Sequence, residues 1–217
     1  MLPSGNSRWL AIAVTLACLV LVVSTVAVAQ QDDVLHVTYF STNAPAPDEA
    51  VRIINPGAYA PSYPPANLCA MVYVFNNDQE LQECCGCLIS PDGLLELGVY
   101  KNLTSNTFTG IRPTNGDIKV VSALPNDFFG GVPCDPTGGG ILPNGSYALN
   151  IQATPDIRGW ATHLQADARV TEDELQPATL SATELYSLQE ECYGIANVGS
   201  GFGICGEGVV NSSEICN

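Results

Sequence analysis

Residues 68–87, LCAMVYVFNNDQELQECCGC, decide the fold because two strand-like runs flank a polar turn segment. The first run contains several β-branched and aromatic residues, and Asn tolerates the left-handed conformation of tight turns, so the stretch predicts a β-hairpin. If Asn76 and Asn77 form a two-residue turn, Cys69 lies opposite Cys84 on the neighbouring strand. Cross-strand neighbours lie close to disulfide reach, so this register predicts a bond between these two cysteines.

The three cysteines in ECCGC raise the question of whether they bind a metal, exchange electrons or form structural disulfides. A loop longer than two residues shifts the hairpin register and favours Cys85 or Cys87 as the partner of Cys69. In an extended strand Cys84 and Cys85 point to opposite faces, whereas Cys85 and Cys87 share one face. We therefore expect the three thiols to reach different partners, among them a loop, a helix or the C-terminal tail.

Metal binding is disfavoured because the Cys-Cys-x-Cys spacing differs from the Cys-x-x-Cys pairs of zinc sites, and no second pair exists. The two histidines, His36 and His163, lie far from the cluster in sequence. We expect disulfides, with neither a metal nor a cofactor.

Residues 1–29 are typical of a secretory signal peptide. A short segment containing Arg8 precedes an almost unbroken apolar run over residues 9–28, and Ala27-Val28-Ala29 fits a small-x-small cleavage pattern. The sequence therefore predicts a secreted or cell-surface protein cleaved after Ala29. The alternatives are that the apolar run remains as a membrane anchor, or that Cys18 is lipidated.

Cysteine usage supports export. The chain has nine cysteines, and only Cys18 precedes the expected cleavage site. An even number in an oxidising compartment predicts four disulfides, whose connectivity the sequence leaves open. The disulfide candidates are Cys69, Cys84, Cys85, Cys87, Cys134, Cys192, Cys205 and Cys216.

Charge narrows the function classes. After loss of Arg8, six basic residues against 22 acidic ones give a net charge of −16. Such a chain repels nucleic-acid backbones and anionic membrane surfaces. We expect no nucleic-acid partner, and no membrane association beyond the signal or a retained anchor.

Short apolar or alternating runs separated by Asn, Asp, Gly and Pro predict an antiparallel β-sandwich, Ig-like in general architecture, over residues 30–170. The expected strands lie at 34–40, 50–55, 68–75, 79–85, 94–100, 117–123, 146–153 and 157–165. No strand alternates with a long helix, which argues against a doubly wound parallel sheet. The long loop over 125–145 is expected to be fastened to the sheet through Cys134.

Residues 171–217 are expected to form a C-terminal helix and a cysteine-containing tail that pack on the same domain. The capping boxes at 171–174 and 181–184 predict, respectively, a short turn that Pro177 ends and a helix over 182–196. The helix stripe formed by Leu185, Leu188, Cys192 and Ile195 is expected to carry its cysteine inward to a partner.

No catalytic constellation emerges. The chain lacks a Gly-x-Ser-x-Gly elbow, His163 is a lone strand histidine with an expected structural role, and no carboxylate pair stands out among 22 acidic residues. The oxygen-rich segments 76–80 and 135–140 do not match the twelve-residue calcium loop. The sequence favours a role other than catalysis.

The ordered blocks LCAMVYVF, QECCGC, LTSN, IKVVSA, WATHLQ and LSATEL, followed by GSGFGIC, cover roughly residues 50–206. In this order they resemble a group of exported, cysteine-rich hypothetical proteins of soil bacteria, for which no activity is established. The resemblance implies export and a bacterial host, and it assigns no site residues.

We therefore expect a secreted, disulfide-stabilised, non-catalytic extracellular protein that is structural, surface-associated or adhesive and binds an extracellular protein or glycan. A secreted hydrolase, for example one acting on glycosides through a carboxylate pair, is the alternative. An inhibitor or toxin-like effector would use the 125–145 loop.

Overall fold

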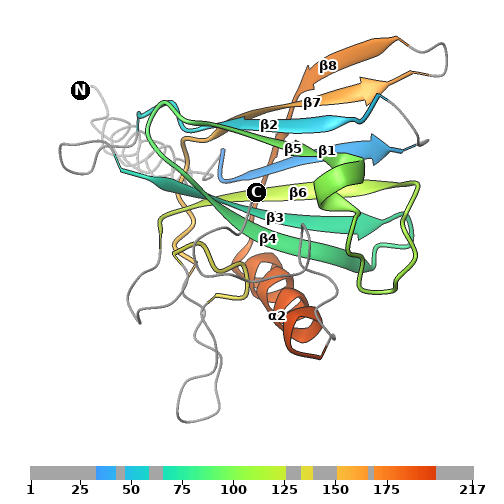
Figure 1. Cartoon of the computed structure of the whole chain (residues 1–217). Helices are drawn as coiled ribbons and strands as arrows, with labels where there is room; N and C mark the ends of the chain where they lie inside the picture. Colours follow the sequence, from blue (N-terminus) through green and yellow to red (C-terminus); the bar gives the residue numbers. More distant parts are fainter. Residues whose placement is uncertain are drawn as a thin grey trace, which may run out of the picture. The chain divides into compact units, whose positions relative to one another are not determined.

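The computed structural model describes residues 33–42, 47–58, 66–125, 133–138, 151–165 and 169–198. They form two antiparallel sheets and a C-terminal helix, so the expected mainly β fold is confirmed at that level (Figure 1). The five-stranded sheet has the order β4-β3-β6-β1-β9, with β1 Leu35–Ser41, β3 Leu68–Asn76, β4 Leu81–Ile89, β6 Asn115–Ala123 and β9 Gln176–Ala178. The four-stranded sheet has the order β5-β2-β7-β8, with β2 Ala50–Ile54, β5 Leu94–Gly98, β7 Arg158–Leu164 and β8 Val170–Glu174.

Two further elements complete the described chain. A π-helical turn, η1, covers Val99–Leu103, and the helix α2 covers Ala182–Val198. No helix among the described residues has the length and apolar character needed to cross a membrane. The expected signal segment over residues 1–29 and the expected strand residues 146–150 lie outside the described part, and residues 151–153 contribute a single bridge between Ala123 and Ala153.

One hydrophobic cluster draws side chains from both sheets. Val72 of β3 and Ile118 of β6 come from the five-stranded sheet, and Ile53 of β2 and Ala161 of β7 come from the four-stranded sheet. All four are at most 2% exposed. The alternation of these strands therefore buries one face of each sheet in a shared core.

A second cluster covers the other face of the five-stranded sheet. Cys69, Met71 and Tyr73 of β3 join Leu188 and other residues of α2 in this cluster. The intervening β3 residues belong to the core shared with the four-stranded sheet. Because β3 is covered on both faces, its sequence is a continuous apolar run rather than an alternating one. Figure 1 shows α2 beside β4, with which it makes contact.

The second capping box starts α2 as expected. The backbone N–H of Glu184 donates to Ser181 Oγ over 3.0 Å, which satisfies one of the free donors at the helix start. The Glu184 carboxylate instead pairs with Lys119 Nζ of β6, 2.8 Å away. The helix runs two residues beyond the predicted end at Ala196.

The predicted turn at residues 171–174 is wrong. These residues lie in β8, which pairs with β7, and Pro177 lies in β9 at the edge of the other sheet. Leu175 joins the two strands: its N–H donates to the Gly159 carbonyl and its side chain, 2% exposed, enters the core between the sheets. Burial of this leucine and strand pairing override the local helix-start signal.

The predicted hairpin register is also wrong. Tyr73, and not Cys69, lies opposite Cys84, whereas Cys69 lies opposite Leu88. Four residues, 77–80, connect β3 and β4, and the Asn76 side-chain oxygen accepts hydrogen bonds from the N–H groups of two of them. A bulge next to the turn shifts the register further. The longer turn moves Cys69 away from Cys84.

Candidate functional site

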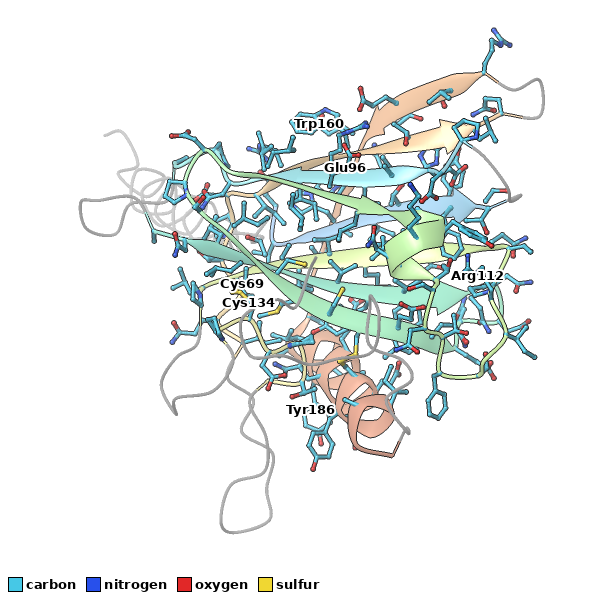
Figure 2. The ribbon with its side chains drawn as sticks, viewed as in Figure 1. Cys69, Glu96, Arg112, Cys134, Trp160 and Tyr186 are labelled. Atoms are coloured by element: carbon cyan, nitrogen blue, oxygen red, sulfur yellow. A yellow bond between two sulfur atoms is a disulfide. The ribbon has the colours of Figure 1, made fainter. Side chains whose placement is uncertain are left out.

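Two disulfides fasten separate segments onto the same face of the five-stranded sheet. Cys84 of β4 bonds Cys192 of α2, with Cα atoms 5.9 Å apart, and Cys69 of β3 bonds Cys134 of the 133–138 segment, with Cα atoms 5.5 Å apart. Figure 2 shows the second bond beside the sheet. The four residues are at most 1% exposed. The structure thus joins Cys192 to a sheet partner and holds Cys134 to the sheet, as predicted.

The strand alternation predicted for the ECCGC stretch is confirmed. Cys84 belongs to the cluster under α2, whereas Cys85 and Cys87 belong to the core between the sheets. Cys85 and Cys87 are also disulfide-bonded. The candidates Cys205 and Cys216 lie outside the described residues. Among the residues that the structure describes, no group of three or more His, Cys, Asp or Glu residues could hold a metal ion.

Gly86 makes room for the segment that carries Cys134. A Cβ atom added at Gly86 would lie 1.8 Å from the Cys134 carbonyl oxygen and 3.0 Å from Met71 Sδ. The backbone of the segment therefore crosses β4 directly over this glycine. We call the region where α2 and the 133–138 segment are bonded to β3 and β4 the cysteine junction. Glycine between two cysteines is a packing requirement of this junction, because any other side chain would displace the crossing segment.

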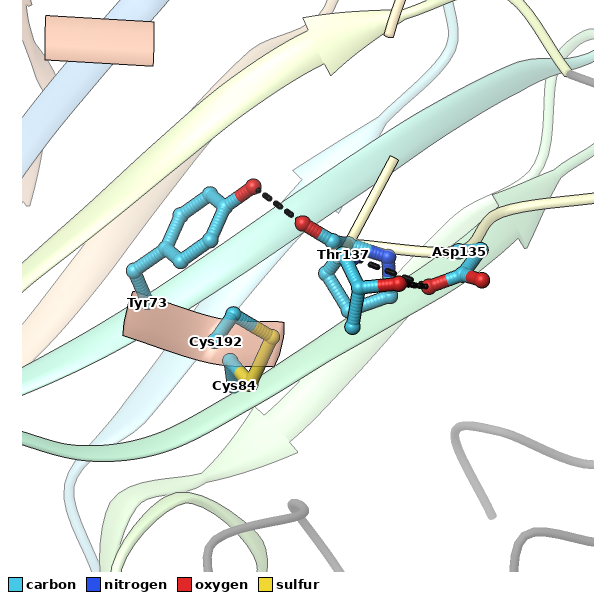
Figure 3. The surroundings of a disulfide bond; sticks show 6 residues. Tyr73, Cys84, Asp135, Thr137 and Cys192 are labelled. Atoms are coloured by element: carbon cyan, nitrogen blue, oxygen red, sulfur yellow. Dashed lines mark hydrogen bonds between the residues drawn. A yellow bond between two sulfur atoms is a disulfide. The ribbon is translucent and has the colours of Figure 1, made fainter. Parts of the chain in front are cut away.

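The same segment is held by the side chain of Tyr73 (Figure 3). The fully buried Tyr73 hydroxyl donates to the Pro136 carbonyl over 2.9 Å, and burial together with the nearby Asp135 raises the tyrosine pKa. The Asp135 carboxylate accepts from the N–H and hydroxyl of Thr137, at 2.9 and 2.6 Å. Both hydrogen bonds go to Asp135 Oδ1 and close a local turn.

A buried carboxyl group, Glu83, was not predicted from sequence. The residue is fully buried, Glu83 Oε1 accepts from the Asn106 N–H over 2.6 Å, and Oε2 has no partner. Burial raises the pKa of Glu83 to about 8, opposed by the Asn106 hydrogen bond and the Arg112 charge. The signal was present in the alternation, since Glu83 lies two residues before the inward-facing Cys85.

The charge of Arg112 acts on this carboxyl and favours its ionised form. Its guanidinium lies 3.5 Å from the centre of the Tyr100 ring, a cation–π contact, and its buried Nη1 has no hydrogen-bond partner. Figure 2 shows Arg112 close to η1. An acceptor and a donor, each without a partner, thus lie within electrostatic range of one another.

Both histidines occupy strands, as expected. His163 of β7 is 3% exposed and stacks on Tyr39 of β1, with ring centres 4.1 Å apart. His36 Nε2 donates to the Asp33 carbonyl over 3.2 Å, and burial lowers the His36 pKa. The first is a packing contact and the second a local turn contact.

An open cavity of about 430 Å³ lies between the β3–β4 hairpin and the C-terminal part of α2. It brings together two carboxylates that the sequence did not single out, Glu80 of the hairpin turn and Glu191 of α2. Desolvation and the neighbouring Glu190 raise the pKa of Glu191, and Lys119 opposes this shift. The lining residues are Gln79, Glu80, Leu81, Gln82, Phe108, Thr109, Glu191, Gly194 and Ile195.

This cavity adjoins the cysteine junction, because Cys192 directly follows Glu191 and Leu81 begins the strand that carries Cys84. The junction thus fixes the two elements that supply the carboxylates. The comparison with known proteins does not extend this description: no protein-family model, no curated protein and no solved structure matches the chain.

Proposed function

We propose that this chain is a secreted, non-catalytic extracellular protein that binds a partner or ligand on a disulfide-bonded β framework. The observation that carries the proposal is the pair of buried disulfides joining the sheet to α2 and to the 133–138 segment. Buried disulfides of this kind add stability in an oxidising compartment and are shielded from thiol exchange. Their place in the fold supports a structural role for the cysteines.

We further propose that the two sheets form an Ig-like sandwich. Residues of both sheets meet in one hydrophobic cluster, and among the strands that the structure describes only the β3–β4 and β7–β8 connections join neighbours in one sheet. Connections that cross between two antiparallel sheets are a feature of sandwiches. The resemblance to exported proteins of soil bacteria supports the assignment of export and of a bacterial host.

Expression of the full chain in a bacterium with a periplasm tests the exported, oxidised state. We expect the protein in the periplasm or medium, shortened by cleavage after Ala29, with no reactive thiols after denaturation. A variant lacking residues 1–29 should stay in the cytoplasm with reduced cysteines. Accumulation of the full chain in the cytoplasm with free thiols would contradict the proposal.

A secreted hydrolase remains the second candidate because one cavity holds Glu80 and Glu191. Glycoside hydrolysis uses one carboxyl group as acid and another as base or nucleophile, and the raised pKa of Glu191 suits the acid. Chromogenic glycosides test this role. A hydrolase should lose about 100-fold or more of its rate in either Glu80→Gln or Glu191→Gln and keep it in Glu190→Gln. No turnover by the oxidised wild-type protein would favour binding alone.

A further inference from the structure

We propose that the cavity between the β3–β4 hairpin and α2 binds a small organic cation with an apolar body, such as an arylalkylammonium ion. The inference names the ligand class for the binding role proposed above and rests on that role. It is carried by the charges, the apolar surface and the rigid support of the cavity.

The charges favour a cation. Glu80 and Glu191 reach the cavity from two different elements, and none of its lining residues is Lys, Arg or His. The nearby Lys119 is occupied elsewhere, since its Nζ pairs with Glu184 over 2.8 Å and lies 5.3 Å from the centre of the Phe75 ring. The net charge of −15 adds a long-range attraction for cations.

The remaining walls suit an apolar body. Leu81 and Ile195 are each 7% exposed, and the larger part of the exposed cavity wall is apolar. Phe108 lines the cavity and is 42% exposed overall, so an aromatic ring is available for contact with an ammonium group. A cavity of about 430 Å³ lies within the range of small-molecule sites.

The carboxylates stand on fixed supports. Glu80 Oε2 accepts from Asn76 Nδ2 over 3.2 Å, and the Glu80 N–H donates to the Asn76 side chain over 2.9 Å. The bond between Cys84 and Cys192 holds the helix wall one residue after Glu191. Walls that are ordered before binding lower the entropy cost of taking up a ligand.

Ionisation of Glu191 sets the pH dependence. Desolvation, and to a smaller extent Glu190 on the same helix, favour its neutral form, Lys119 of β6 favours the charged form, and Glu80 lies across the cavity. Because a cation binds the ionised carboxylate more tightly, affinity should rise as the pH rises through the titration of Glu191.

Calorimetric titration of the exported, oxidised protein with phenethylamine, 2-phenylethanol and phenylacetate tests the inference. Phenethylamine should bind about tenfold or more tightly than the neutral alcohol, and phenylacetate should not bind measurably. At a pH above the titration of Glu191, Glu191→Gln and Glu80→Gln should each weaken amine binding about tenfold, whereas Glu190→Gln, on the exposed helix surface outside the cavity lining, should leave it unchanged. Phe108→Leu should weaken the amine more than the alcohol.

Equal affinity for amine and alcohol, equal losses in Glu190→Gln and Glu191→Gln, or no amine binding to folded, oxidised protein would each overturn the inference. The export and thiol measurements remain independent of this result. Failure of the cation site is thus distinguishable from failure of the proposed extracellular role.

Discussion

Replacement of Gly86 by alanine is the sharpest single perturbation of the junction. The added methyl carbon would lie 1.8 Å from the Cys134 carbonyl oxygen and 2.8 Å from its carbonyl carbon. Real Cβ contacts essentially never fall below 3.0 Å, so the carbonyl oxygen must move by at least about 1.2 Å. The disulfide between Cys134 and Cys69 and the hydrogen bond from Tyr73 to Pro136 oppose that movement.

Two costs add in this variant. Overpacking of a buried site costs about 1–3 kcal/mol, and separating the buried Tyr73 hydroxyl from the Pro136 carbonyl costs about 1–3 kcal/mol more. We expect a loss of about 3 kcal/mol in the free energy of unfolding. For a domain of this size, that loss lowers Tm by roughly 6–12 °C, measurable by circular dichroism of the oxidised protein.

Gly194→Ala is the matched control. Nothing lies within 4 Å of a Cβ added at Gly194 in α2, so this change should raise the unfolding free energy by about 0.5–1 kcal/mol through helix propensity. The two glycine variants should thus move Tm in opposite directions. If Gly86→Ala, with the bond between Cys69 and Cys134 intact, unfolds at the wild-type temperature, the assigned crossing over β4 is incorrect.

Three further variants test neighbouring contacts. Glu83→Gln should remove a pH dependence of stability. Because the folded-state pKa of Glu83 is raised to about 8, its contribution to stability is complete below the ordinary pKa of 4.5 and is lost as the pH rises to about 8, so the unfolding free energy of the wild type minus that of the variant should fall by a few kcal/mol across this range. A difference in urea titrations that does not change with pH would contradict the burial of the carboxyl group. Tyr73→Phe should cost about 1–2 kcal/mol, because the Pro136 carbonyl loses its buried donor, and an unchanged urea midpoint would refute that contact. Ser181→Ala should cost about 1 kcal/mol and Ser181→Asp almost nothing, whereas equal midpoints for both would argue against the helix cap.

Local periodicity predicted the features that depend on a single element. Period-two alternation separated Cys84 from Cys85, and the helical stripe with the Ser181 cap placed Cys192 toward the sheet. These signals hold because each strand or helix has to bury one apolar face whatever its partner is. The same alternation places Glu83 on the buried face of the strand, although its charge alone would suggest an exposed position.

Features that depend on contacts between distant segments could not be predicted from the local sequence pattern. The Asn76 side chain favours a longer turn than the two-residue one and thereby changes the partner of Cys69. The acidic segment 171–174 matches a helix start, but burial of Leu175 makes strand pairing more favourable. The cavity carboxylates Glu80 and Glu191 are 111 residues apart in sequence, and only the packing of α2 beside the hairpin brings them to one site.

The most direct test of the junction is mass spectrometry of the exported, oxidised protein after proteolysis without reduction. Peptides joined through Cys69–Cys134 and Cys84–Cys192 should be recovered, with Cys85 and Cys87 also resistant to alkylation. A bond between Cys69 and Cys84, or alkylation of the ECCGC thiols in folded protein, would contradict the account.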